Sequence, residues 1–105
     1  MTLGIITLQE FLLSHEELAA MPDKGNSRDA NKAGFLHDFS SGRLDRYKET
    51  FVAYQRGNLV GQSWDGKLLF KEATGYYGAS SLTVFGVPKE PSGLTNVVEM
   101  TVIKR

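Results

Sequence analysis

The 105-residue chain contains no cysteine and carries no net charge, and each absence excludes a class of function. Without cysteine there is no disulfide framework, thiolate zinc site, iron–sulfur cluster or cysteine nucleophile, and stability depends on packing alone. Twelve basic residues are balanced by twelve acidic ones, so the chain as a whole lacks the charge of a polyanion-binding protein. Nucleic acid is therefore not the expected partner, although a local basic patch can exist inside a neutral total.

Long apolar runs are also absent. No run approaches the ~20 residues that a membrane span requires, and the first ten residues have neither a basic segment nor a sustained apolar one, as a signal peptide would. Together with the missing cysteine, this favours a cytoplasmic protein with no membrane partner. The composition, 41% apolar and 23% charged, is that of a folded globule. A chain of this length buries one core, so we expect a single domain over residues 1–105.

The beginning of the chain has a helical pattern. Thr7 and Glu10 have the spacing of a capping box, and apolar residues then fall on one helical face over residues 8–19. Ser14 and Glu17 form a second box inside the same stretch. The sequence therefore predicts one amphipathic helix, or alternatively two short ones that break at Ser14.

A second helix is expected over about residues 28–39. Ser27 is suited to cap its first turn, and Gly42 is suited to a left-handed position after its end. Together the two predicted helices make residues 1–43 a helical N-terminal arm.

The pattern changes to that of a sheet at Thr50. Aromatic and β-branched residues fill residues 50–55, and a second extended segment covers residues 59–64. The tight turn Arg56-Gly57-Asn58 between them predicts a β-hairpin. Gly61, inside the second strand, indicates a bulge or a close backbone approach.

The rest of the chain predicts one more helix and two more strands. Asp65 is suited to cap a helix of about residues 67–77, and strands are expected over residues 81–87 and 96–103. The apolar residues 68–70 are equally compatible with a third antiparallel strand in place of the helix.

These elements define the predicted fold class. It is an α+β fold, in which two N-terminal helices precede a small mixed β-sheet of about four strands with ββαββ order. The helix between the second and third strands permits a right-handed parallel crossover, and all helices are expected on one face of the sheet. Residues 44–105 would then form a β-rich core.

The sequence FVAYQRGNLVGQSWD at residues 51–65 resembles a motif of a family of small bacterial domains of unknown function. Those domains pair a hairpin with a helix and then with a strand that ends in a Val-Pro-like turn, which is Val87-Pro88 here. Residues 44–47 are similar to the approach to the hairpin in such domains. The resemblance covers residues 44–88 and implies a hairpin–helix–strand fold, and it implies no reaction.

Catalytic and metal-binding patterns are not found. His37 and Asp38 are adjacent, with Ser40 nearby, but neighbours on a helix point in different directions and no nucleophile elbow is present. His15 lacks a second ligand at a suitable spacing. No calcium loop or glycine-rich phosphate loop occurs. We therefore predict no catalytic residue, no metal, no cofactor and no enzymatic activity.

The remaining candidates are side chains that are typical of protein recognition. They come from the apolar face of the first predicted helix and from the aromatic and basic residues of the hairpin, and Trp, Tyr and Arg dominate binding hot spots. The alternative is that most of the aromatic residues form the core. The predicted interaction residues are Phe11, Leu12, His15, Tyr54, Arg56 and Trp64.

These observations favour a non-enzymatic interaction or regulatory domain that binds a protein partner or a second copy of itself through a surface. Two alternatives stay open. A nucleic-acid-associated regulator, such as an antitoxin-like component, would use the basic and aromatic residues Arg43, Arg46, Lys48, Arg56, Tyr47 and Tyr54. A small-molecule-binding protein or enzyme accessory subunit would use a pocket between the helices and the sheet.

Overall fold

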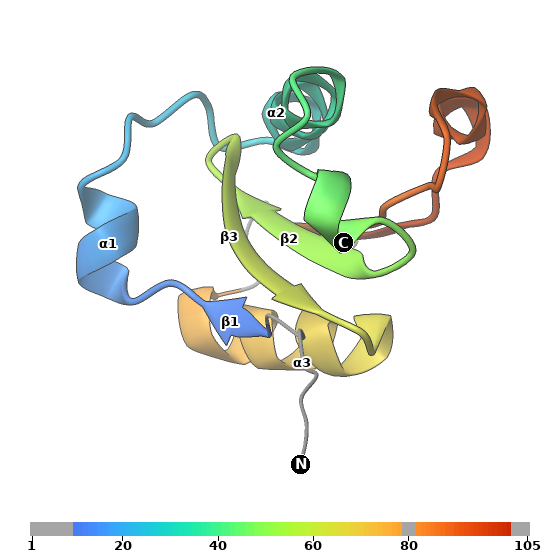
Figure 1. The fold of residues 1–105 in the computed structure, drawn as a ribbon. Coiled ribbons are helices and arrows are strands. Elements are labelled where there is room, and N and C mark those ends of the chain that lie inside the picture. The colour runs from blue at the N-terminus through green and yellow to red at the C-terminus, as the bar shows by residue number, and fades with distance from the viewer. Residues whose placement is uncertain (1–9, 79–81, 102–105) are drawn as a thin grey trace, which may run out of the picture.

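The computed structural model describes residues 10–78 and 82–101, which fold as a five-stranded sheet between helices (Figure 1). The strands are β1 (Phe11–Leu12), β2 (Phe51–Gln55), β3 (Asn58–Ser63), β4 (Thr83–Gly86) and β5 (Glu99–Thr101). The α-helices are α1 (His15–Ala19), α2 (Arg28–Ser40) and α3 (Gly66–Tyr77). Two short 3₁₀ helices are η1 (Asp45–Tyr47) and η2 (Pro91–Asn96).

The sheet has the order β1-β3-β2-β4-β5, and each described neighbouring pair is antiparallel. Side chains alternate between its two faces, so each face carries its own core. The cluster on the α3 face consists of Leu18, Ala53, Val60, Leu69, Ala73, Leu82 and Val84. The cluster on the α2 face consists of Phe35, Phe39, Leu44, Val52, Tyr54, Phe85 and Val87.

The hairpin of β2 and β3 forms where the sequence predicts it. Arg56 and Gly57 have φ values of 56° and 78°, as a two-residue turn that matches the twist of the strands requires. The register shifts between Ala53 and Tyr54, which confirms the bulge that Gly61 indicates.

The hairpin turn docks directly on α2. The buried Asn31 accepts a hydrogen bond from the Gly57 N–H at 2.8 Å and donates one to Thr83 of β4 at 3.2 Å. A Cβ atom on Gly34 would lie 2.2 Å from the Gly57 carbonyl oxygen. The absence of a side chain at Gly34 is therefore what lets the helix approach the turn this closely.

The predicted sheet arrangement is wrong in three respects. Over the described residues the sheet is antiparallel and not mixed, a fifth strand precedes the helices, and helices cover both faces. The helix α3 does connect two strands that run in the same direction, because β3 and β4 are both antiparallel to β2. However, β2 lies between them, so the expected parallel crossover pair does not form.

The predicted first helix is also wrong at its start. Phe11 and Leu12 are a strand that pairs with Gln62 and Gly61, because the exposed edge of β3 offers backbone partners that the local helical pattern does not reveal. The alternative break is confirmed, since Ser14 and Glu17 cap α1 reciprocally at 2.8 and 3.0 Å. Thr7, from the first capping box, lies outside the described residues.

The other predicted elements occur close to their expected positions. The helix over residues 28–39 is α2, and the helix over residues 67–77 is α3, so residues 68–70 are not a strand. Asp65 accepts the capping hydrogen bond from the Leu68 N–H at 3.1 Å. The last two strands are shorter than predicted within the described range.

The described part of the predicted N-terminal arm, residues 10–43, packs on the sheet of its own chain. Leu18 belongs to the core on the α3 face, and Phe35 and Phe39 belong to the core on the α2 face. The Phe35 and Phe85 rings stack with their centroids 4.5 Å apart. Removing these side chains from the sheet would expose both cores.

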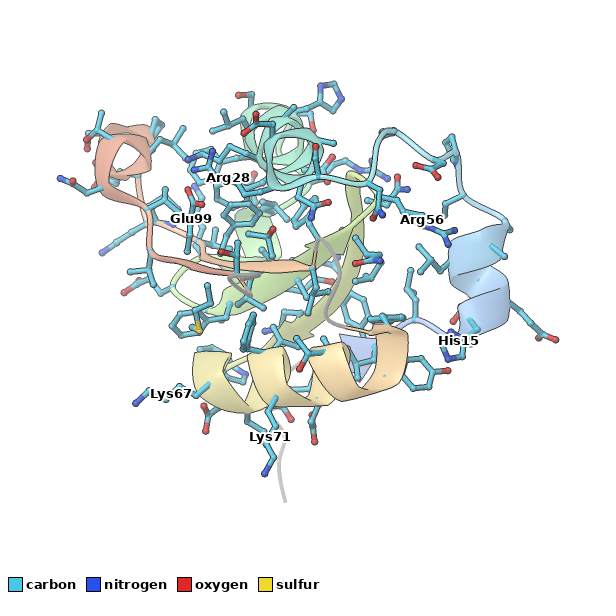
Figure 2. The ribbon with its side chains drawn as sticks, turned by 180° about the vertical axis from the view of Figure 1, so that it is seen from behind. His15, Arg28, Arg56, Lys67, Lys71 and Glu99 are labelled. Carbon is cyan, nitrogen blue, oxygen red and sulfur yellow. The ribbon has the colours of Figure 1, made fainter. Side chains whose placement is uncertain are left out.

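An ionic cluster joins the start of α2 to the edge strand β5. Glu99 accepts hydrogen bonds from Arg28 at 2.9 and 2.7 Å and from Lys32 at 2.8 Å, and Figure 2 shows Arg28 and Glu99 pointing toward one another. Partial burial raises the pKa of Glu99, but the hydrogen bonds from Lys32 and Arg28 together outweigh it, so the pKa lies below its ordinary value.

We expect Glu99→Gln to lower the free energy of unfolding at pH 7 by about 1 kcal/mol, because Arg28 is half exposed and solvent screens the pair. The stabilisation is complete above the unfolded-state pKa of ~4.3 and is lost as the pH falls through the lower folded-state value. Urea unfolding at pH 7 and below pH 4 measures both effects. Glu72→Gln, on the exposed face of α3, is the matched control. An equal difference between wild type and Glu99→Gln at both pH values would contradict the linkage.

Candidate functional site

The six predicted interaction residues do not form one surface. Tyr54 is fully buried in the core on the α2 face, whereas Trp64 is 54% exposed at the end of β3. Arg56 lies in the hairpin turn, where its carbonyl oxygen accepts a hydrogen bond from the Lys24 N–H at 3.0 Å. Phe11 and Leu12 lie together on the edge strand β1.

His15 joins α1 to the end of α3 (Figure 2). Its ring stacks on Tyr76 at 4.2 Å between centroids and meets the edge of Tyr77 at 5.9 Å. The Tyr77 hydroxyl donates to the Leu13 carbonyl oxygen at 2.6 Å, and burial raises the pKa of Tyr77 to about 12. These contacts fix α1 to α3, so the position of His15 is explained by packing between elements.

One hollow of the described surface lies on the α2 face of the sheet, beside β1 and β3. Its volume is about 510 Å³, which is in the range of ligand-binding pockets. We call it the basic groove. Its apolar lining consists of Phe11, Leu13, Met21, Tyr47 and Leu59. Its charged lining consists of Lys24, Asp38, Arg43 and Arg46.

Three different parts of the fold supply the positive charges of the basic groove. Lys24 comes from the connection between α1 and α2, which is fixed to the hairpin turn through Arg56. Arg43 follows the C-terminal end of α2, and Arg46 belongs to η1. The positive φ of 86° at Gly42 turns the chain between α2 and η1. The groove is thus assembled by tertiary structure from segments that are distant in sequence.

The only carboxylate in the lining, Asp38, is already engaged inside the protein. It is 7% exposed and accepts a hydrogen bond from the Tyr54 hydroxyl at 2.6 Å and a weaker one from Arg43 at 3.4 Å. Burial, and then the hydrogen bond to Asp38, raise the pKa of Tyr54 far above its ordinary value. The Tyr54 hydroxyl is therefore a donor at every physiological pH.

The lining of the groove has three cationic side chains and one carboxylate, and that carboxylate is bound to Tyr54, so the groove has an excess of positive charge. Among the described residues, neither Lys24 nor Arg46 forms an ion pair within 4 Å. The side chain of Arg43 is 70% exposed and points one guanidinium nitrogen toward Asp38. Three cationic groups in one lining with apolar side chains suit a ligand that carries negative charge on an apolar body.

A second hollow of about 310 Å³ lies between β1 and α3, on the other side of the strand. Leu12, Leu68 and Leu69 supply apolar lining, and Glu10 and Glu72 supply negative charge. Glu10 also accepts a hydrogen bond from the Ser63 hydroxyl at 3.0 Å. We call this hollow the acidic pocket.

Sequence reasoning identified part of the basic groove. Arg43, Arg46 and Tyr47 were candidates for the nucleic-acid alternative, and Phe11 was a candidate interaction residue, but Lys24 and Leu59 were missed. No local signal joins Lys24 to the two arginines, because the groove exists only after the hairpin turn has docked on α2. Asp38 and His37 do not act as a pair, since Asp38 binds Tyr54 while His37 is exposed.

Comparisons of the chain with protein-family models, with curated proteins and with solved structures find no match. Within residues 10–78 and 82–101, no group of three or more acidic or histidine side chains is placed to hold a metal ion. No helix of this part of the chain has the length and apolar character needed to span a membrane.

Tyr54→Phe is expected to reduce the free energy of unfolding by about 1–3 kcal/mol, because it leaves a buried carboxylate without its shortest hydrogen bond. Urea unfolding followed by circular dichroism measures the change. Tyr76→Phe, at a 42% exposed position, is the control and should change stability by less than about 0.5 kcal/mol. Equal stability of Tyr54→Phe and wild type would show that the Tyr54–Asp38 bond does not support the wall of the groove.

Proposed function

We propose that this chain is a non-enzymatic interaction domain that binds an acidic, partly apolar segment of a partner protein in the basic groove. The proposal is carried by one observation: three cationic side chains line the groove together with apolar ones, and the only carboxylate of the lining is bound to Tyr54. A partner segment would bury Phe11, Leu13 and Leu59 and would supply the missing negative charge.

The lining supports a binding role in preference to catalysis. It contains no histidine, and its one acidic group accepts a buried hydrogen bond from the Tyr54 hydroxyl. An apolar patch edged by polar groups is the usual anatomy of a protein-recognition surface, and the lining supplies both kinds of side chain. The fixed backbone of the hairpin turn and of the end of α2 keeps this surface in shape before a partner arrives.

The same lining supports a protein partner in preference to nucleic acid. A nucleic-acid site needs a continuous row of cations for phosphates and aromatic faces for base stacking. Here the Tyr47 ring is tilted by 49° against Phe11 at 6.2 Å, so the two rings pack on one another. Aliphatic side chains supply the rest of the apolar lining, and these suit apolar side chains of a peptide.

The test uses a fluorescein-labelled peptide of alternating Glu and Leu and measures its affinity by fluorescence anisotropy. We expect Arg43→Glu/Arg46→Glu to weaken binding by about tenfold or more, because each substitution replaces attraction by repulsion. The matched control is Lys67→Glu/Lys71→Glu, whose lysines point away from the sheet on α3 (Figure 2). The control should change affinity by less than about twofold, and binding should weaken as salt increases.

Three results would overturn the proposal. The first is equal loss of affinity in both double variants. The second is tighter binding of a single-stranded oligouridine than of the peptide at physiological salt, which would assign the groove to RNA. The third is a monomer–dimer equilibrium that Arg43→Glu/Arg46→Glu abolishes, which would make the occupant a second copy of the chain.

A further inference from the structure

The strand β1 lies at one edge of the sheet and has peptide groups directed away from it. Phe11 pairs with Gln62, and the Leu13 N–H donates to the Val60 carbonyl oxygen at 2.8 Å. In an antiparallel pair, alternate residues direct their N–H and C=O groups toward the partner strand. Since residues 11 and 13 face β3, the N–H and C=O groups of Leu12 point outward, to the open edge.

The two hollows described above meet along this edge. Leu13 lines the basic groove, Leu12 lines the acidic pocket, and Phe11 contacts both. The groove is on the side of the sheet covered by α2, and the pocket is bounded by α3 on the other side. In Figure 1, β1 is the outermost strand on its side of the sheet, with α3 below it.

The two hollows have opposite charge. Lys24, Arg43 and Arg46 make the groove positive, whereas Glu10 and Glu72 make the pocket negative. Successive side chains of an extended peptide point to opposite faces of a sheet. A strand placed beside β1 would therefore direct every second side chain into the groove and the ones between into the pocket.

We propose that the partner segment adds to the sheet as a sixth strand along β1, and that its charges alternate with period two. Acidic and apolar side chains enter the basic groove, and basic side chains enter the acidic pocket. This inference rests on the proposed function and specifies its binding mode. The backbone of Leu12 supplies main-chain hydrogen bonds, and the two hollows supply selectivity.

The length of the added strand is limited by the chain itself. At Ser14 the backbone N–H is already bound by the Glu17 side chain at 2.8 Å, and α1 begins directly after it. The open edge among the described residues thus extends only over residues 10–13. A helical partner would make no main-chain hydrogen bonds with Leu12 and would not alternate its side chains between the two hollows.

The experiment compares two peptides of identical composition, each about nine residues long. In the first, Glu occupies four of the five odd positions with Leu at the central one, and two Lys and two Leu occupy the even positions, so that the peptide is acidic overall. In the second, Lys and Glu are distributed over both sets of positions. We expect the alternating peptide to bind about tenfold more tightly, and N-methylation of its central backbone amides to remove that advantage. Amide exchange of Leu12 should slow on binding.

Reversing the charges of the acidic pocket tests which side chains of the peptide enter it. Glu10→Lys/Glu72→Lys should weaken the alternating peptide about tenfold, and a peptide with Glu in place of its lysines should recover affinity for this variant. Glu90→Lys, on the exposed turn before η2, is the control. Circular dichroism reports folding, and Glu10→Gln/Glu72→Gln provides the same test with a smaller loss if the lysine variant unfolds.

The outcomes separate the two proposals. Equal binding of both peptides, each sensitive to Arg43→Glu/Arg46→Glu and neither affected by N-methylation, would overturn strand addition and leave the basic groove as the binding site. Absence of binding by both peptides and by the Glu–Leu peptide would overturn the proposed function itself. Slower exchange at Leu12 without an effect of Arg43→Glu/Arg46→Glu would place the peptide on the edge and overturn its side-chain assignment.

Discussion

The close contact between α2 and the hairpin turn is the constraint on which the other features depend. Gly34 allows the helix to meet the Gly57 carbonyl, and Asn31 holds the turn from the helix side. A buried amide bonded on both sides fixes one relative position, because any other leaves a polar group unsatisfied. The position of α2 on the turn determines where the C-terminal end of the helix lies in space. It therefore also determines the distance between Arg43 and Leu59. The basic groove is a product of this docking as much as of its own lining.

Much of the local structure was predictable because its causes are local. The turn at residues 56–57 and the caps at Ser14, Ser27 and Asp65 involve residues a few positions apart, and the structure confirms each. The order of strands in the sheet was not predictable, because it depends on pairing between strands that are distant in sequence. Phe11 and Leu12 illustrate the difference: their spacing suits a helix, but a long-range pairing with Gly61 determines their conformation. The placement of helices on both faces follows from the same long-range choice.

The candidate site was less predictable than the fold. Its residue types were visible, and Phe11, Arg43, Arg46 and Tyr47 were considered from the sequence. Their grouping was not, since Lys24 and Leu59 join them only through tertiary contacts. Tyr54 shows the opposite error. This aromatic residue suggests recognition, but it is fully buried, and its hydroxyl donates a hydrogen bond to Asp38 inside the protein. The sequence shows which side chains are chemically suited to recognition, and the fold determines which of them are exposed to a partner.

The position of β2 between β3 and β4 affects the order in which the chain can assemble during synthesis. The apolar sides of α1 and α2 are made before most of the surface that buries them, because the larger part of both core clusters comes from β2, β3, α3 and β4. Until the hairpin and α3 have been made, most of the apolar surface of α1 and α2 lacks the partners that bury it. The strand β4 then joins the sheet by pairing with β2, about thirty residues earlier in the chain, and β5 pairs with β4 after it. The N-terminal half is therefore the part that most needs protection from aggregation while the protein is being made.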